Sequence, residues 1–162
     1  MGVCMQVKLA MAAVAAGAMM FCGTASAAPY PDGGVTAGQV AAVLQANGYQ
    51  AEITKDGEGD PMVRSAADGT KYRILFYGCK GTARCTALEF LVGFDLPNGM
   101  TMEKLNKWNR DSRFGHAYLD DENDPYLQLD LNSSPGFTSE SMATYVETWT
   151  ALVPKFKTYI GF

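Results

Sequence analysis

The sequence predicts an α+β domain in which helices cover one face of a mostly antiparallel sheet. Two stretches rich in β-branched and aromatic residues, 72–78 and 86–94, flank a short loop that contains a glycine, as in a β-hairpin. The C-terminal stretch instead repeats apolar side chains at intervals of three and four, as a half-buried helix does. Because most turns between the expected strands are short, successive strands should pair antiparallel. The expected order of elements is α-β-β-β-β-α-β-β-α.

Residues 1–27 have the features of an export signal. An apolar run of 14 residues, 9–22, follows the single charged residue Lys8, and a small-x-small cleavage pattern ends at Ala27. The run is too short for a transmembrane helix, which needs about 20 apolar residues. We expect cleavage after Ala27 and a mature protein in the periplasm or outside the cell. A lipoprotein signal ending at Cys22 is the alternative, and the bulky residue before that cysteine argues against it.

The length and charge of the mature chain limit its class. Removal of residues 1–27 from the 162-residue chain leaves 135 residues, which is a common length for one domain with its own core. Residues 28–35 are rich in proline and glycine and indicate a flexible lead, so we expect a single domain at 36–162. The chain has 13 basic and 17 acidic side chains, and loss of one lysine with the signal changes the net charge from −4 to −5. An acidic domain repels nucleic acid and anionic lipid, so we expect neither as a partner and no membrane insertion after cleavage.

Two cysteines remain after signal removal, and they predict a disulfide across the hairpin. An even number of cysteines in an exported protein favours a disulfide between Cys79 and Cys85. If these two face each other, opposed residues have numbers that sum to 164, and Ile74 lies opposite Phe90 on a wholly apolar face. The other face then carries polar residues, among them Arg73 with a glutamate as its diagonal neighbour.

Redox and metal chemistry are weaker interpretations of the same cysteines. A redox dithiol usually has two residues between its cysteines, and here there are five. A zinc site needs four ligands, and His116 is the only histidine. We therefore expect a structural disulfide, no metal and no cofactor.

The other elements follow from caps, turns and periodicity. Thr36 and Gln39 form a capping box at the start of the first helix, and a glycine ends that helix. Asp68 and Gly69 are a tight-turn pair that leads into the long hairpin. Pro154 should kink or restart the last helix, because proline removes a hydrogen bond. The remaining expected ranges are helix 36–47, strand 49–54, a short edge-like strand 61–65, a helix from 101 to about 110–112, a second hairpin with strands 114–120 and 126–131, and a last helix over 142–160.

No spacing in the sequence marks a catalytic centre. No serine lies in a Gly-x-Ser-x-Gly pattern, and the sole histidine lies on an expected strand. The acidic stretch 56–60 alternates like a calcium loop, but Pro61 and Ala67 occupy the positions that need glycine and glutamate. A second acidic stretch, 120–124, is typical of a solvated turn. The alternatives that stay open are a hydrolase with a carboxylate pair and a weak calcium-binding protein.

The second helix carries an unusual polar face. Asn106, Asn109 and Arg113 are spaced at i, i+3 and i+7, so they share one side of a helix beside Trp108. Asparagine is mildly unfavourable within a helix, so this pattern needs a reason. Either the amides satisfy backbone groups at the end of the sheet or helix, or the residues form a recognition face.

Several segments resemble the exported branch of the YbjN-domain family. The resemblance runs from about 36 to 160. It rests on 105–109 with Arg113, on 117–120, on 65–69, on the cysteine hairpin 76–85, and on the last helix with Trp149 and Phe156.

The resemblance implies a fold like that of type III secretion chaperones. Those chaperones are dimers that bind extended segments of other proteins, and the family label is a regulator of sensory transduction. The family supplies no catalytic residues. We therefore expect a non-catalytic periplasmic module that binds a protein partner and forms a homodimer.

Overall fold

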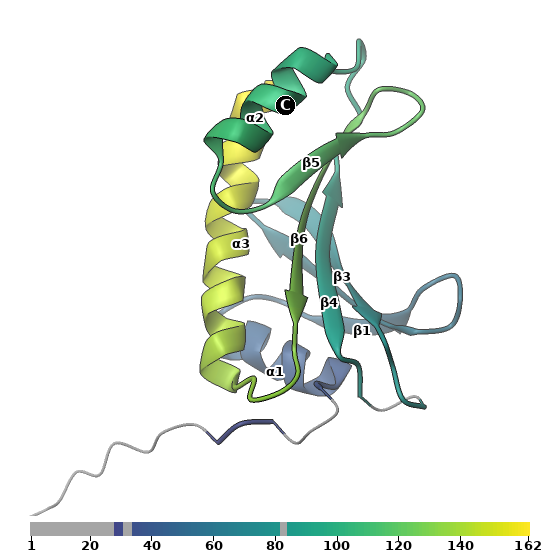
Figure 1. Cartoon of the computed structure of the whole chain (residues 1–162), viewed down its shortest axis with the longest axis vertical. Coiled ribbons are helices and arrows are strands. Elements are labelled where there is room, and N and C mark those ends of the chain that lie inside the picture. The colour runs from purple at the N-terminus through teal and green to yellow at the C-terminus, as the bar shows by residue number, and fades with distance from the viewer. Residues whose placement is uncertain (1–27, 31–33, 82–83) are drawn as a thin grey trace, which may run out of the picture.

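The computed structural model describes residues 28–30, 34–81 and 84–162 (Figure 1). The expected signal at 1–27 lies outside the described residues. The described chain confirms the expected order of three helices and six strands. The elements are α1 (Ala37–Ala46), β1 (Glu52–Lys55), β2 (Pro61–Ala67), β3 (Thr70–Tyr77), β4 (Ala87–Gly93), α2 (Met102–Asp111), β5 (His116–Leu119), β6 (Pro125–Asn132) and α3 (Ser139–Ile160). Within this described part, no helix combines the length and apolar composition needed to cross a membrane.

The six strands form one antiparallel sheet in the order β1-β2-β3-β4-β6-β5. β2 therefore lies between β1 and β3, and the expectation that 61–65 is an edge strand is wrong. β1 and β5 form the two edges instead. The Asp68-Gly69 turn lets β2 pair with β3 along its whole length, since both turn residues adopt positive φ angles of 49° and 73°.

The central hairpin has the expected register and disulfide. Ile74 lies opposite Phe90, and Phe76 lies opposite Leu88, as the sum of 164 requires. The disulfide joins Cys79 and Cys85, whose Cα atoms are 3.9 Å apart. A shift of the pairing by one residue would mix the apolar and polar faces, and the observed register shows no such shift.

Part of the expected flexible lead is packed against this hairpin. Val35 is fully buried and exchanges two backbone hydrogen bonds with Cys85, of 3.0 and 2.9 Å. A Cβ atom on Gly34 would lie 1.9 Å from the carbonyl oxygen of Cys85, so only glycine allows this approach. Val35, the last residue of the expected flexible lead, is thus packed against the hairpin.

Helix α1 confirms its predicted cap. The backbone N–H of Gln39 donates to the Thr36 hydroxyl over 3.2 Å, and the Thr36 N–H donates to the Gln39 side chain over 2.9 Å. These two bonds satisfy N–H groups that have no partner within the helix. The buried side of α1 then packs into the core through Val40 and Leu44.

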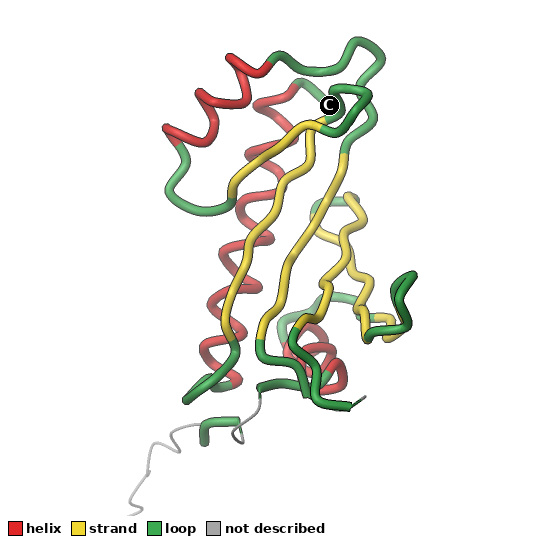
Figure 2. The backbone as a smooth tube through the Cα atoms, turned by 45° about the vertical axis from the view of Figure 1, so that its right-hand side comes forward, coloured by secondary structure: helices red, strands yellow, loops and turns green. Residues whose placement is uncertain are grey.

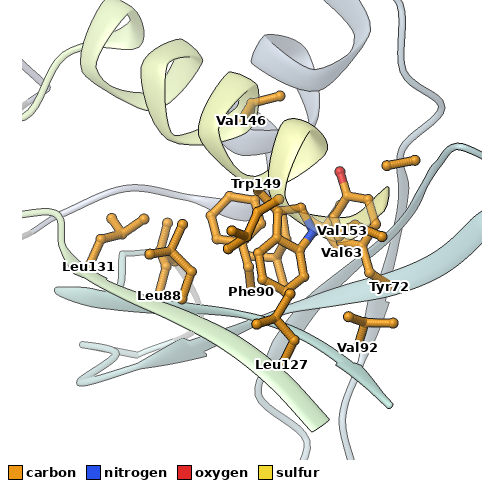
Figure 3. Close-up of a cluster of buried hydrophobic side chains, with 14 of the residues drawn as sticks. Val63, Tyr72, Leu88, Phe90, Val92, Leu127, Leu131, Val146, Trp149 and Val153 are labelled. Carbon is orange, nitrogen blue, oxygen red and sulfur yellow. The ribbon is translucent and has the colours of Figure 1, made fainter. Parts of the chain in front are cut away.

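One hydrophobic core lies between the helices and one face of the sheet. Trp149 of α3 is fully buried, and its ring lies 5.5 Å from Phe90 and 5.7 Å from Tyr72 (Figure 3). Burial raises the pKa of Tyr72 to about 12. Figures 1 and 2 show α3 running lengthwise beside the long strands.

Helix α3 continues through Pro154 without a break, so the expected restart does not occur. Proline leaves the carbonyl of Thr150 without its usual donor. The core contacts of Val153 and Phe156 on either side keep the helix in place despite this loss.

Candidate functional site

The face of the sheet that points away from the helices is the candidate site. The core contains residues of all three helices together with one face of the sheet, which we call the covered face. The opposite face has no helix over it in the described chain, and we call it the open face. Alternation along the strands decides which side chains reach it. Its residues include Arg64 of β2, Arg73 of β3, Glu89 of β4 and Asp130 of β6.

A groove of about 820 Å³ lies on the open face where two strands separate. The pairing of β3 with β4 ends at Arg73 and Leu91, whereas the pairing of β4 with β6 continues to Gly93 and Tyr126. The strands diverge beyond that point, and the open-face groove occupies the space. Its lining includes Leu91, which is 5 % exposed, and the basic side chains Arg64, Lys71 and Arg73.

Two stacked tyrosines stand beside this groove. The rings of Tyr118 and Tyr126 lie 5.2 Å apart and within 10° of parallel. Tyr126 covers Gly93 so closely that a Cβ atom there would lie 2.5 Å from the ring. The glycine therefore allows an aromatic side chain to lie flat on the sheet and border the groove.

The basic side chains of the groove include a directly opposed pair. Arg64 and Arg73 face each other across β2 and β3, and we call them the cationic pair. Among the residues that the structure describes, neither arginine forms an ion pair. Like charges that are directly opposed across a sheet destabilise it. The groove lining also includes the acidic residues Asp95, Asp124 and Glu52, and Glu52 lies opposite Arg64 across β1 and β2. The groove therefore holds two opposed arginines within a lining of mixed charge.

A directly opposed acidic pair lies on the same face. Glu89 of β4 faces Asp130 of β6, and we call these the acidic pair. Partial burial and the charge of Asp130 raise the pKa of Glu89, although His116 and Arg73 act in the other direction. Gln128 donates a hydrogen bond of 2.9 Å to Asp130, and the His116 Nε2 atom lies 4.0 Å from the same carboxylate.

The acidic pair bears on the hydrolase alternative. A hydrolase with two carboxylates would need a deep pocket around them and a raised pKa on at least one. Glu89 has the raised pKa, but neither Glu89 nor Asp130 lines the open-face groove or the groove between α2 and α3. The arrangement therefore presents two carboxylates on the open face, outside both of these grooves.

Asn109, from the expected polar face, holds the edge of the sheet. Its amide nitrogen donates to the carbonyl of Ala117 over 3.0 Å, and its amide oxygen accepts from the Ala117 N–H over 2.8 Å. The side chain thus pairs with β5 as a neighbouring strand would, and it covers part of that outer edge. Asn109 thus makes the hydrogen bonds to backbone groups that the first of the two interpretations describes.

The other members of the expected face are separated from it. Asn106 is exposed, and Trp108 is buried against Phe156 with ring centres 4.8 Å apart. Arg113 lies beyond the end of α2 and stacks over Phe114 at 5.3 Å, because the helix ends at Asp111. The three polar residues therefore do not share one helical surface, since the expected i+7 position falls outside the helix.

A second groove of about 640 Å³ lies between α2 and α3. Its lining includes Trp108 and Arg113 from the expected polar face, together with exposed Phe114. The Nε1 atom of Trp108 is buried and has no hydrogen-bond partner among the described residues. The groove is thus formed by side chains of α2, of α3 and of the segment 112–114 that follows α2, and the opposed charged pairs of the open face do not line it.

The two acidic turns use their first aspartate to hold their own backbone. The Asp56 carboxylate accepts from the N–H groups of Glu58 and Asp60, and Asp120 accepts from the second and fourth residues after it in the same way. Such bonds are the usual role of aspartate in a turn. Within the described ranges, no group of three or more His, Cys, Asp or Glu side chains is placed to hold a metal ion.

The sequence contained a signal for the cationic pair that we did not use. A two-residue turn at Asp68 and Gly69 makes opposed residues in β2 and β3 sum to 137, which sets Arg64 against Arg73. The polar face of the central hairpin already included Arg73. Extending the register by one strand would have found the pair.

Comparison with known proteins decides the family. The family model YbjN, described as "Putative bacterial sensory transduction regulator", matches residues 29–162. This chain belongs to the YbjN family. No curated protein sequence matches the chain.

A solved structure shows the fold that this YbjN chain shares. The chain is similar to the Yersinia pestis type III secretion chaperone SycH, which was crystallised in complex with a stable fragment of YscM2. The two are 16% identical, with a TM-score of 0.51, and the match covers 76% of this chain and 98% of the other. The chaperone-like fold that the sequence resemblance implied is therefore confirmed.

Proposed function

We propose that this YbjN chain is an exported, non-catalytic module that holds an extended segment of another protein on its open face. The open-face groove carries the proposal, because it lies on the sheet face that no described helix covers. The family and the chaperone-like fold support a binding role, and the similar chaperone SycH was solved with a fragment of another protein. A regulator that acts by binding needs such an accessible surface.

The shape of the groove suits a single extended chain. Its lining includes Leu91, Tyr126 and basic side chains, together with the buried residues Tyr72 and Val92. An extended segment rises about 3.3 Å per residue, so a few residues would span it. Apolar contacts at Leu91 would stabilise the complex, and polar contacts at the rim would select the segment.

The disulfide supports export. Disulfides persist in oxidising compartments, and the Cys79–Cys85 bond closes the central hairpin. We expect the mature protein to begin at Ala28 and to reside in the periplasm or outside the cell. N-terminal sequencing of the native protein tests this, and a mature chain that begins at Met1 would contradict it.

A photo-crosslinking amino acid placed at Ala66 tests binding on the open face. Ala66 lines the groove, and Glu147 on the exposed side of α3 is the matched control position. We expect the same partner segment to be attached repeatedly at Ala66 and not at Glu147, as identified by mass spectrometry of the crosslinked peptides. Equal attachment at both positions, or none at Ala66, would contradict the proposal.

Strand addition at β1 is the second candidate mode of binding. Among the described residues β1 pairs only with β2, whereas Asn109 covers part of the outer edge of β5. Ile53 of β1 is 55 % exposed, and an extended segment could pair with this edge as in other strand-addition complexes. The same crosslinker at Ile53 distinguishes the modes, because edge binding predicts stronger attachment at Ile53 than at Ala66.

A further inference from the structure

We propose that the segment held on the open face carries an acidic and a basic residue about four positions apart. The cationic pair would hold the acidic residue, and the acidic pair would hold the basic one. This inference rests on the proposed function and specifies the chemistry of the segment that is bound. It follows from the positions of four charged side chains on four adjacent strands.

The first step is that each pair sets two like charges directly opposite one another, although Glu52 of β1 also lies opposite Arg64. Arg64 and Arg73 form no ion pair among the described residues. Burial and then the charge of Asp130 raise the pKa of Glu89, although His116, Arg73 and a hydrogen bond with Tyr77 act in the other direction. Opposed like charges destabilise a sheet, so two such pairs on one surface indicate a surface shaped by something other than stability.

The second step is the spacing between the pairs. Arg73 pairs with Leu91, and Leu75 pairs with Glu89, so the acidic pair is displaced by two residues along the strands. The pairs are also displaced by two strands sideways. Strands lie about 4.8 Å apart and two residues span about 7 Å, which places the pairs roughly 12 Å from one another. An extended chain covers about 13 Å in four residues, and those side chains point the same way.

The third step is the surface between the charges. Leu75 and Leu91 lie between the two pairs, and Leu91 is buried although it faces the open side. The residue midway between the acidic and basic positions of the segment would lie over these leucines. We therefore expect an apolar residue there, because burying a polar one without a partner is costly.

A second copy of the chain also presents unlike charges, but it fits the surface less well. Turned by a half rotation, a copy would set its acidic pair against the cationic pair. Only the cationic side lines the groove, and the carboxylates Glu89 and Asp130 lie outside it. Two such faces would place flat sheet over the groove and leave it unfilled, which loses packing contacts. A single extended segment can place its acidic residue in the groove and continue beyond it to the acidic pair.

Four labelled nonapeptides test the inference on the mature chain. They share one neutral, strand-favouring frame and carry Glu/Lys, Glu/Glu, Lys/Lys or Gln/Gln at two positions four apart. Fluorescence anisotropy at low salt should show the Glu/Lys peptide binding roughly tenfold more tightly than the Gln/Gln peptide, which corresponds to about 1.4 kcal/mol. The double variant Arg64→Glu/Arg73→Glu should instead prefer Lys/Lys.

Two control variants keep the test specific. Arg110→Glu on exposed α2 should leave the order of peptides unchanged, and Arg73→Lys should retain the wild-type order. Circular dichroism and a melting curve establish that each variant is folded. A reversed preference in the arginine double variant with a native melting curve cannot arise from unfolding.

Several results would overturn the inference. Equal affinity for all four peptides, or no binding of any, would do so. A different outcome would assign the surface to a second copy. In that case the wild type forms a salt-sensitive dimer and shows no peptide preference. Arg73→Lys preserves this dimer, and Arg64→Glu/Arg73→Glu abolishes it. If the Ala66 crosslinker still captures a partner segment in any of these cases, the proposed function stands and only the charge pattern falls.

Discussion

The two faces of the same strands differ in the side chains that they place directly opposite one another. On the covered face, directly opposed residues attract, as Ile74 with Phe90 and Phe76 with Leu88 do. On the open face, two directly opposed pairs repel, Arg64 with Arg73 and the acidic pair, although Glu52 also faces Arg64. The backbone register is common to both faces, so strand pairing alone cannot explain the difference.

The difference teaches what each face contributes. On the covered face, apolar side chains are buried against α1 and α3. This burial stabilises the folded state roughly in proportion to the apolar area removed from water. On the open face, the opposed like charges lower the stability of the folded state and place charge at fixed positions. Surfaces that sacrifice stability in this way are typical of binding sites.

The largest expected effect breaks the covered face. Trp149→Ala should lower the free energy of unfolding by about 3–5 kcal/mol, because it removes a fully buried indole from between Tyr72 and Phe90. Tyr118→Ala on the open face is the control and should cost far less. Urea denaturation measures both, and similar losses in the two variants would contradict the contrast between the faces.

The next effect tests the disulfide that joins the two central strands. The double variant Cys79→Ala/Cys85→Ala should lose about 2 kcal/mol, because a reduced loop has more freedom in the unfolded chain. Reduction of the wild type should have a similar effect. An unchanged melting temperature in both experiments would show that the disulfide does not form in the native protein.

A smaller effect tests how the sheet edge is held. Asn109→Ala should cost about 1–3 kcal/mol, because it leaves two backbone groups of Ala117 without partners. Asn106→Ala, at an exposed position of the same helix, should be close to neutral. If Asn109→Ala instead left stability intact and abolished partner binding, the recognition interpretation of this residue would be favoured.

The pH dependence of stability tests the acidic pair. The pKa of Glu89 is raised in the folded state above its ordinary value of 4.5, so its contribution to stability is present below pH 4.5. That contribution is lost as the pH rises through the higher folded pKa. Glu89→Gln should therefore become more stable than the wild type as the pH rises toward neutral, by urea denaturation. A constant difference across this range would contradict the raised pKa of Glu89, which burial and then the charge of Asp130 produce.

Local signals predicted most of the fold. The cysteine pair and the apolar alternation agree on one register for β3 and β4, and the capping box set the start of α1. The edge assignment of β2 failed because strand order depends on contacts between distant segments. Pro154 was expected to restart α3, but packing of its neighbours keeps one helix.

The candidate site was predicted less well than the fold. Periodicity placed Asn109 on a polar face of α2, but its partner Ala117 lies eight residues later on another element. The opposed pairs of the open face require the register of two further ladders, β2–β3 and β4–β6. The first could be derived from the Asp68-Gly69 turn. The second could not, because α2 and β5 separate β4 from β6 in the sequence.

The central claim is that the repulsion between Arg64 and Arg73 outweighs the attraction of Glu52 and Glu89 for these arginines. Arg73→Gln, measured by urea denaturation at low and at high salt, tests this claim most directly. We predict that the variant is more stable than the wild type by a few tenths to about 1 kcal/mol at low salt, and that the difference disappears at high salt. A variant less stable than the wild type at low salt would show that the attraction between Arg73 and Glu89 outweighs the repulsion from Arg64, and would contradict the account.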